Sequence, residues 1–510
     1  MHKQDWRPSQ RGHSYAPNSK YMTFSPALVN RSVDYRRKRR RRTSKETQFA
    51  LAFGFAVAAP TALYLGSGAP MAWATPGDVV TGLGILAGLI ATQMVIIMLL
   101  LAARIPWVDK TIGLDRAITL HNQLGKPSLY GLLLHGLLIT VGYGLSEGVN
   151  PITETMSLIG ISDMVWAYIS MALFISVVVS SLVVVKRKLP REFWMGVHFL
   201  SYAAVAASVP HQFSMGSVLA SGTISRWYWI TAYLLTASAI LVFRVALPLV
   251  QSLRTSLRVS DVAVSSWRQL PSGDSVPDSW TVTMTGPGVA QLEAESGQFF
   301  RWRFLTPQLW MQQHPFSLSA APTRNSLRIT VRDLGSGSNA VGSVKPGTRV
   351  FFAGPYGLFT EAARTQPKLV LAGAGAGIGP IRSLVETADF EPGECTVIIR
   401  ASDEDSLLLR DEIRELCWNR GAVLFELVGH RARLTDLHPD TPDAEAKLKR
   451  SSWLPADHTL AGYTLESYAP HLSQSDVYVC GPTAWTDAVL ADAEAAGLKH
   501  ESLHSERFSW

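Results

Sequence analysis

Apolar and polar positions divide the chain near residue 250. Before that point, six stretches are apolar and long enough for membrane-spanning helices, which need about 20 residues each. These stretches cover residues 49–65, 79–103, 121–143, 163–185, 194–212 and 227–250. After residue 255 the pattern changes to short strand-like and helix-like segments separated by glycine and proline. The pattern predicts a multidomain chain: a six-helix transmembrane bundle, then an antiparallel β-barrel, then an α/β domain.

Positive charge is concentrated before the first apolar stretch. The first 45 residues contain 13 Lys and Arg against two Asp, a net charge of +11. Because the whole chain carries +7, the rest carries −4, and the basic pI does not indicate a nucleic-acid-binding fold. We interpret residues 1–45 as a basic, disordered cytoplasmic tail that contacts anionic lipid; a nucleic-acid-binding tail is the alternative.

The loops between the apolar stretches predict the orientation in the membrane. Loops 104–120 and 186–193 contain Lys and Arg, whereas loops 66–78 and 144–162 contain neither. Because cytoplasmic loops are rich in Lys and Arg, we expect a multi-pass protein of the cell membrane with both termini in the cytoplasm. The three cysteines all follow residue 390 without metal-binding spacing, which fits a reducing compartment.

Two pairs of histidines lie inside the apolar stretches. His121 and His135 are 14 residues apart in one stretch, and His198 and His211 are 13 apart in another. A helix rises about 1.5 Å per residue, so each pair spans roughly 20 Å. Two such helices side by side offer His121 with His198 near the inner face and His135 with His211 near the outer face. This arrangement is typical of ligands for two haems in series; histidines hydrogen-bonded within a bundle are the alternative.

Residues 255–365 contain two stretches that suggest a flavin site. His314-Pro315-Phe316-Ser317 places an aromatic ring and a hydroxyl on adjacent strand positions, where they can cover a flavin and bond its polar edge. Downstream, Val331-Arg332 is followed by glycines and hydroxyls that include Gly337 and Ser338, as a pyrophosphate-binding loop requires. An ordinary strand and loop remain the alternative for each stretch taken alone.

Residues 366–510 carry the signals of a nucleotide-binding domain. A strand at 368–372 leads into a glycine-rich turn and then a helix, a context in which the backbone can approach a pyrophosphate. The turn contributes Gly373, Gly375, Gly377, Gly379 and Pro380. Arg400 ends the next strand, where it could pair with the 2′-phosphate of NADPH; a solvated surface arginine is the alternative.

The end of the chain adds two more candidates. Cys480-Gly481-Pro482 follows a strand and could place a thiol at a nicotinamide, and the final Trp510 could stack on a flavin. The predicted domains are the tail at 1–45, the haem-binding transmembrane domain at 46–250, the FAD-binding domain at 255–365 and the NAD(P)-binding domain at 366–510.

Together, these features resemble the NADPH oxidase and ferric reductase family of membrane flavocytochromes b, over residues 49–510. The histidine spacings match the family's haem ligands, and His314-Pro315-Phe316-Ser317 is similar to its flavin motif. The turn at 373–380 and Cys480-Gly481-Pro482 are similar to elements shared with ferredoxin–NADP reductases. The resemblance implies that Ser317 lies near flavin N5, Cys480 near the nicotinamide, and Trp510 on the isoalloxazine.

Two departures from the animal superoxide-producing relatives concern the outer face. Those relatives have another histidine where this chain has Ile139, and an arginine in the second span, where residues 79–103 contain none. Superoxide is therefore in doubt as the product, and no calcium-binding EF-hand loop is visible.

The sequence thus predicts a membrane oxidoreductase that contains FAD and two b-type haems. We expect it to pass electrons from cytoplasmic NADPH, or NADH, to a small-molecule, periplasmic or extracellular acceptor. Its remaining partner is the lipid bilayer, and no nucleic acid is expected. The alternative is a haem carrier or transporter with a non-catalytic reductase-like tail.

Overall fold

The computed structural model describes residues 26–69, 73–182, 185, 188–270, 272–433, 436, 448 and 450–507. The chain forms two compact units, one of residues 44–247 and the other of residues 1–43 with 248–510. We call these the membrane unit and the reductase-like unit and describe each by itself.

The membrane unit consists of helices. Among the described residues, six helical segments are long and apolar enough to cross a membrane, at Thr43–Gly66, Pro76–Ala102, Leu114–Glu147, Ser162–Ser181, Glu192–Met215 and Ile224–Thr255. All six predicted spans are therefore found. The first belongs to α1 (Pro26–Gly66), which continues through Pro60. The predicted disorder of residues 26–45 is therefore wrong, because the same helix extends through them.

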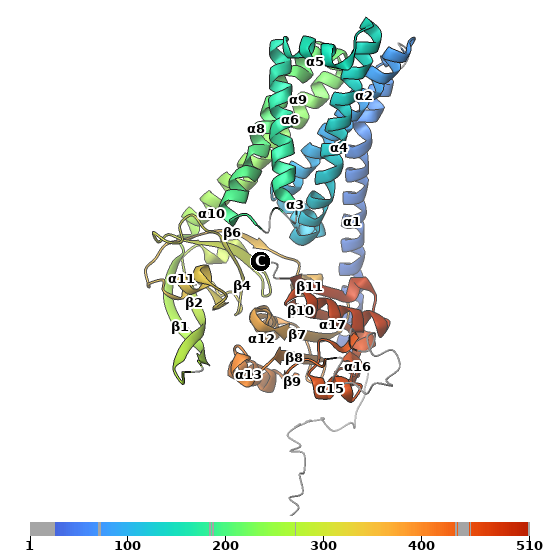
Figure 1. Cartoon of the computed structure of the whole chain (residues 1–510). Helices are drawn as coiled ribbons and strands as arrows, with labels where there is room; N and C mark the ends of the chain where they lie inside the picture. Colours follow the sequence, from blue (N-terminus) through green and yellow to red (C-terminus); the bar gives the residue numbers. More distant parts are fainter. Residues whose placement is uncertain are drawn as a thin grey trace, which may run out of the picture. The chain divides into compact units, whose positions relative to one another are not determined.

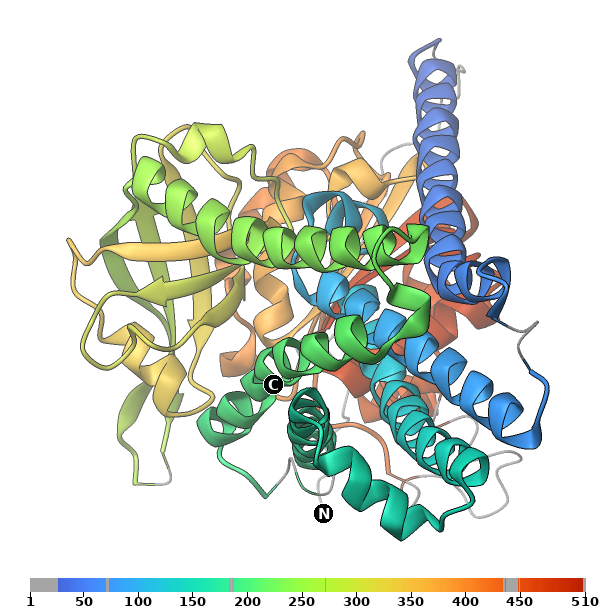
Figure 2. The same cartoon turned by 90° about the horizontal axis from the view of Figure 1, so that it is seen from above.

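Four helices place the predicted histidines. Helix α2 (Pro76–Ala102) lies along α4 (Leu114–Glu147), and α6 (Ser162–Ser181) lies along α8 (Arg191–Met215), as Figures 1 and 2 show. Helix α4 carries His121 and His135, and α8 carries His198 and His211. Helix α8 continues through Pro210 to Met215, so His198 and His211 lie on one helix.

Two short helices of the membrane unit lie outside the predicted spans. Helix α3 (Pro106–Ile112) follows α2, and α5 (Pro151–Ile159) joins α4 to α6. The Asn150 side chain begins α5 by accepting hydrogen bonds from the amides of Ile152 and Thr153, both at 3.0 Å. After α9 (Ile224–Ala239), a π-helical segment, Ile240–Ala246, leads into α10 (Leu247–Thr255).

The first part of the reductase-like unit is antiparallel. Its six strands are β1 (Arg258–Gln269), β2 (Ser275–Thr285), β3 (Phe299–Phe304), β4 (His314–Ser317), β5 (Ser326–Arg332) and β6 (Val350–Tyr356). They form two three-stranded sheets, ordered β1-β2-β5 and β4-β3-β6, around one apolar core. The isolated bridges Arg258–Arg349 and Leu318–Ile329 join the two sheets. The antiparallel prediction is confirmed, and a closed barrel stays a prediction.

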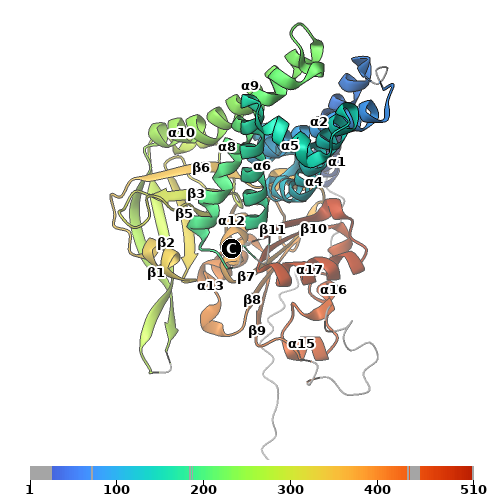
Figure 3. The same cartoon turned by 45° about the horizontal axis from the view of Figure 1, so that its top comes forward.

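The second part is a parallel five-stranded sheet ordered β11-β10-β7-β8-β9 (Figure 3). Its strands are β7 (Lys368–Ala374), β8 (Cys395–Ala401), β9 (Val423–Val428), β10 (Ser475–Gly481) and β11 (Leu503–Arg507). Alternate strand residues pack on opposite faces. One face is covered by α12 (Ile378–Thr387) and α13 (Arg410–Arg420). The other is covered by α16 (Leu465–Tyr468) and α17 (Thr483–Ala495), and the predicted α/β domain is confirmed.

The order of these strands fixes where a nucleotide can bind. Strand β7 lies between β8, the next strand in the chain, and β10, which comes much later. Ligands of such sheets bind at the carboxyl ends of the strands where the order reverses. That point lies between the ends of β7 and β10. The glycine-rich turn follows β7 and Cys480 lies near the end of β10, so both are found there.

Candidate haem and flavin sites

The inner histidine pair consists of His121 on α4 and His198 on α8. The two imidazole centroids are 6.1 Å apart. Imidazole nitrogens bind metal ions at about 2 Å, so two rings that share one ion can have centroids about 6 Å apart. The spacing of the inner pair would therefore allow both histidines to hold one haem iron.

Hydrogen bonds hold the inner rings in place. His121 Nδ1 lies 3.0 Å from the Met98 carbonyl oxygen. A carbonyl only accepts, so Nδ1 carries the proton and Nε2 keeps its lone pair for a metal. His198 Nδ1 lies 3.4 Å from Ser181 Oγ, and the Trp194 ring stacks on its imidazole.

The space beside the inner pair is small. The cavity has a volume of about 60 Å³ and is lined by apolar side chains that include Leu99 and Phe174. Ligand pockets usually measure about 300–1,000 Å³. A porphyrin at the inner pair therefore requires the lining side chains to move outward.

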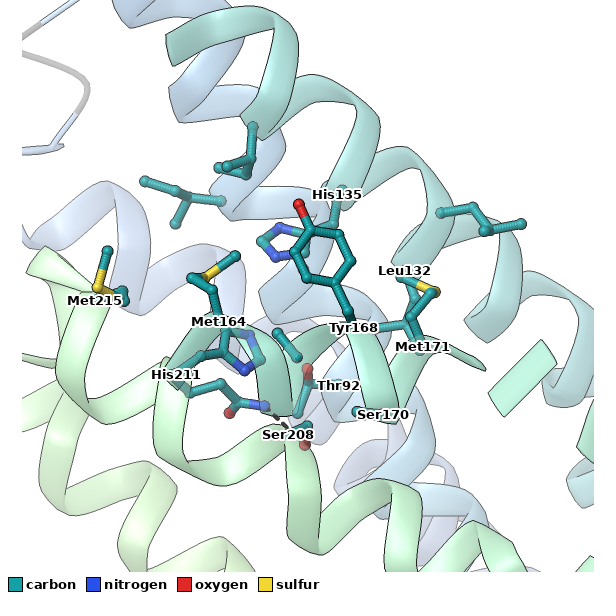
Figure 4. Close-up of a pocket in the computed structure, with 18 of the residues that line it drawn as sticks. Thr92, Leu132, His135, Met164, Tyr168, Ser170, Met171, Ser208, His211 and Met215 are labelled. Carbon is teal, nitrogen blue, oxygen red and sulfur yellow. Dashed lines mark hydrogen bonds between the residues drawn. The ribbon is translucent and has the colours of Figure 1, made fainter. Parts of the chain in front are cut away.

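The outer pair, His135 on α4 and His211 on α8, lines a much larger cavity of about 620 Å³, which we call the outer cavity (Figure 4). His135 Nδ1 donates a hydrogen bond to the Gly84 carbonyl oxygen at 2.8 Å, which leaves Nε2 for a metal. His211 Nδ1 is buried beside the backbone of Ser208. The volume and the available ring nitrogens fit a haem.

Glycines of α2 let the His135 ring approach. A Cβ at Gly88 would lie 2.6 Å from His135 Nδ1, and a Cβ at Gly84 would lie 3.0 Å from Leu138 Cβ. Gly84 and Gly88 have the GxxxG spacing that allows close helix packing in membranes. The GxxxG spacing is visible in the sequence, but the histidine spacing alone does not indicate that these glycines contact His135.

The predicted flavin residues lie on β4. Phe316 pairs with Phe300 of β3, and Ser317 pairs with Phe299. Ser317 is 6 % exposed, and its Oγ has no hydrogen-bond partner in the described part of the chain. The rings of His314 and Phe316 are nearly parallel, with centroids 5.9 Å apart. Because buried hydroxyls are normally bonded, Ser317 Oγ fits the polar edge of a flavin.

The predicted pyrophosphate loop is only partly available to a ligand. Val331 is buried in the core, so only its backbone can serve, and Ser338 Oγ bonds Leu334 N and Gly335 O within the loop itself. Arg332 Nε donates to Asp278 Oδ2 at 3.0 Å, and its Nη2 lies 3.3 Å from Ser406 Oγ. The Arg332 cation therefore lies between the antiparallel sheets and the nucleotide-binding part.

The glycine-rich turn meets the end of β10. Cys480 pairs with Gly373, and a Cβ at Gly377 would lie 2.0 Å from the Cys480 carbonyl oxygen. Only glycine fits at position 377, because the backbone of the turn touches the backbone of Cys480. Gly379 and Pro380 lie in the first turn of α12, whose amino end favours a pyrophosphate. Gly375, at φ +55°, would place a Cβ 3.9 Å from Arg332 Nη1.

One predicted position, Arg400, differs from expectation. Arg400 is 5 % exposed, and its guanidinium donates to backbone carbonyls of Trp453, Ala401, Leu427 and Gly429. Burial, with the charge of Arg431, lowers the pKa of Arg400 to about 10. The predicted pairing with a 2′-phosphate is therefore not supported, because these donors are already used.

Cys480 and the chain end complete the predicted set. Cys480 is buried, Gly481 ends β10, and Pro482 precedes α17. Trp510 lies outside the described residues.

Comparisons with known proteins agree with this organisation. Residues 87–209 match the model of the ferric reductase like transmembrane component. A flavohemoprotein of Xylella fastidiosa is 24 % identical over 306 residues, which cover 58 % of this chain and 70 % of the relative. Ferredoxin–NADP reductase B of Sorangium cellulosum is 24 % identical over 207 residues, which cover 38 % of this chain and 77 % of the relative.

Two solved structures are similar to about half of this chain. The FAD/NAD-binding domain of nitric oxide dioxygenase from Vibrio cholerae has 19 % identity and a TM-score of 0.37, covering 50 % of this chain and 99 % of that one. A ferredoxin NADP+ reductase from Neisseria gonorrhoeae has 16 % identity and a TM-score of 0.36, covering 49 % and 97 %.

The family match and the sequence relatives support a membrane protein with a ferric-reductase-like transmembrane part and a reductase-like part. The predicted resemblance to the ferric reductase and NADPH oxidase type is confirmed.

Proposed function

We propose that this protein transfers electrons from NAD(P)H across a membrane to a one-electron acceptor on the outer side. The observation that carries the proposal is the position of four histidines on α4 and α8: the rings of His121 and His198 are 6.1 Å apart, and His135 and His211 line one cavity. The ferric-reductase match, which includes His121, His135 and His198, supports a role for these residues.

Each cofactor has candidate residues. Two b-type haems would be held by His121 with His198 and by His135 with His211. FAD would lie against the β4 residues His314, Pro315, Phe316 and Ser317, with Arg332 near its pyrophosphate. NAD(P)H would bind at the turn Gly373–Pro380 and at Cys480-Gly481-Pro482. Similarity to a flavohemoprotein and to a ferredoxin–NADP reductase supports the assignments for FAD and NAD(P)H.

When bound, these groups supply the redox chemistry, and the residues of the chain orient them and exclude side reactions. Ser317 Oγ has its hydrogen-bonding capacity free for a flavin. The first turn of α12 offers backbone amides to a pyrophosphate. The carbonyl oxygens of Met98 and Gly84 fix the proton on Nδ1 of His121 and His135, so Nε2 of each ring would be available to hold a haem iron.

The predicted orientation, with both termini in the cytoplasm, places NAD(P)H use inside. A membrane potential of 100 mV, negative inside, favours export of one electron by about 2.3 kcal/mol. With Arg400 buried, a preference for NADPH would require another cation, and the exposed Arg431 is the candidate.

Anaerobic spectroscopy tests the proposal. Purified full-length protein should show about two b-type haems per chain by the pyridine haemochrome assay. NAD(P)H should reduce these haems, which changes the Soret and α absorption bands. Replacement of His135 with Leu should remove one haem and leave NAD(P)H-dependent dye reduction intact. Haem that stays oxidised after NAD(P)H addition would instead support a haem carrier with a non-catalytic tail.

A further inference from the structure

Helix α10, which ends the last candidate span, is fixed to β6 by hydrogen bonds within the reductase-like unit (Figures 1 and 3). Ser252 is 2 % exposed, and its Oγ accepts a hydrogen bond from the Phe352 amide at 3.0 Å and donates one to the Phe352 carbonyl oxygen at 3.1 Å. Farther along the chain, the Val350 amide donates to the Leu257 carbonyl oxygen at 2.9 Å. The start of β6 therefore lies close to Thr255, where the candidate span ends.

The loop after β3 begins at the same end of β6. The Leu305 amide donates to the Arg349 carbonyl oxygen at 3.0 Å. Leu309 is buried in the apolar core of the antiparallel sheets and anchors this loop. The next two side chains, Trp310 and Met311, are 55 % and 73 % exposed. Tryptophan is enriched where proteins meet the headgroup region of a membrane, because its ring has an apolar body and a polar N–H group.

Positive charge is concentrated at this end of β6. Three segments meet there, residues 251–260, 305–313 and 343–349, and they contain no aspartate or glutamate. Their cations are all exposed: Arg254, Arg258, Lys345 and Arg349. The nearest acid in the sequence, Asp261, lies farther along β1 than Arg258, by about 10 Å at the usual rise of a strand. We call Trp310, Met311 and the four cations the basic apolar patch.

The apolar surface of the last candidate span continues up to the basic apolar patch. Leu249 and Leu253 of α10 are exposed, and Arg254 follows them in the chain. Apolar side chains exposed on a membrane-spanning helix face lipid, and arginine near its end lies at the level of the headgroups. Leu257 and Leu305 flank the start of β6 on opposite sides, so their backbones are about 10 Å apart, or two strand spacings. The loop after β3 is therefore within reach of the same headgroups.

Charge decides which surface fits the basic apolar patch. The predicted cytoplasmic loops of the membrane unit are basic, with three cations against two acids in residues 104–120 and four against one in residues 186–193. These loops offer the patch no complementary charge. The phosphates of anionic lipids do, and they attract lysine and arginine near a membrane surface. An anionic bilayer therefore matches both the cations and the exposed apolar side chains.

We propose that the basic apolar patch binds the surface of a bilayer that contains anionic lipid, with Trp310 and Met311 among the headgroups and the four cations at the phosphates. The antiparallel sheets are then held to the membrane at two points, by α10 and by the loop after β3. The inference goes beyond the proposed function and does not depend on the haem, flavin or nucleotide assignments. It requires only that the candidate span Ile224–Thr255 crosses the membrane.

Spin labels on the full-length protein in nanodiscs test the inference. All three cysteines of the chain are buried, so a label attaches mainly to an added surface cysteine. Met311→Cys places the label in the patch, and Trp418→Cys, at a side chain of α13 that is 75 % exposed, is the matched control. In nanodiscs of phosphatidylcholine and phosphatidylglycerol, the label at residue 311 should be protected from a neutral, water-soluble nickel chelate and accessible to oxygen. The label at residue 418 should be accessible to the chelate.

The lipid and a single cation provide the second comparison. Nanodiscs of phosphatidylcholine alone should leave the label at residue 311 accessible to the chelate. Lys345→Gln should lower the ratio of bound to free loop about fivefold, the contribution expected of one cation at an anionic surface. Lys499→Gln, at an exposed lysine outside the patch, should not change this ratio. Equal chelate accessibility at residues 311 and 418 would overturn the inference, and so would protection that persists without anionic lipid, which would indicate contact with protein.

Discussion

Replacing Gly88 with alanine tests the packing that positions the outer histidine. The new Cβ would lie 2.6 Å from His135 Nδ1 and 2.9 Å from Cε1 and Cγ of the same ring. Ordinary contacts begin at 3.4 Å, so the ring must move by about 0.8 Å, the difference between these distances. The hydrogen bond of 2.8 Å to the Gly84 carbonyl oxygen cannot keep its length and direction during that shift.

The expected effect is weaker haem binding at the outer pair. Loss of a hydrogen bond that orients a metal ligand usually lowers metal affinity about 10- to 100-fold, which corresponds to about 1.4–2.7 kcal/mol. Haem content per chain, measured by the pyridine haemochrome assay after dilution, should fall towards one in Gly88→Ala. The inner pair, which uses the Met98 carbonyl, should keep its haem.

Gly136→Ala is the matched control. It lies on α4 next to His135, but its Cβ would be 3.9 Å from Met171 Cε, an ordinary contact. This variant should keep two haems per chain. Equal haem content in Gly88→Ala and the wild type would refute the proposed packing, and so would equal losses in the two glycine variants.

Three further predictions follow from buried groups. Burial raises the pKa of Asp109 to about 6 from 3.8. Ionisation of Asp109 therefore lowers the free energy of unfolding by about 3 kcal/mol above pH 6 and has no effect below about pH 4. Thermal unfolding should show stability falling between these pH values in the wild type and no such fall in Asp109→Asn. Arg400→Ala should lower the stability by about 1.5–3 kcal/mol and reduce NADPH and NADH use alike, whereas a selective loss of NADPH use in steady-state kinetics would restore the predicted phosphate contact. Gly377→Ala should separate the glycine-rich turn from Cys480 and lower the stability by about 1–3 kcal/mol. Nucleotide binding, measured by titration, should weaken. Unchanged binding would contradict the backbone contact.

The sequence was sufficient where a periodic pattern determines the structure. Spans of about 20 apolar residues must become helices in a bilayer, because backbone groups there have no other partners. The strand-to-helix turn at residue 373 was equally clear, since a buried strand, glycines and a helix follow one another directly. Both predictions depend only on neighbours in the sequence.

Contacts between distant segments were harder to predict. Arg400 ends a strand as expected, but carbonyls as far away as Trp453 enclose its guanidinium, and no local pattern reveals that burial. Glu154 lies in a predicted loop between spans, and its burial depends on the packing of α5 against α4 and α6. The glycines at 84 and 88 were visible as a motif, yet their partner, His135, is set by the packing of α2 on α4.

Electron transfer across a sealed membrane tests the central claim most directly. The full-length protein would be reconstituted in vesicles, with NAD(P)H supplied only to the side that carries the termini and ferricyanide, which does not cross the bilayer, only to the other. We predict reduction of ferricyanide by the wild type and none by His135→Leu, although both variants should reduce a dye on the NAD(P)H side. No ferricyanide reduction by wild-type protein that contains two haems, or equal rates in the two proteins, would contradict the account.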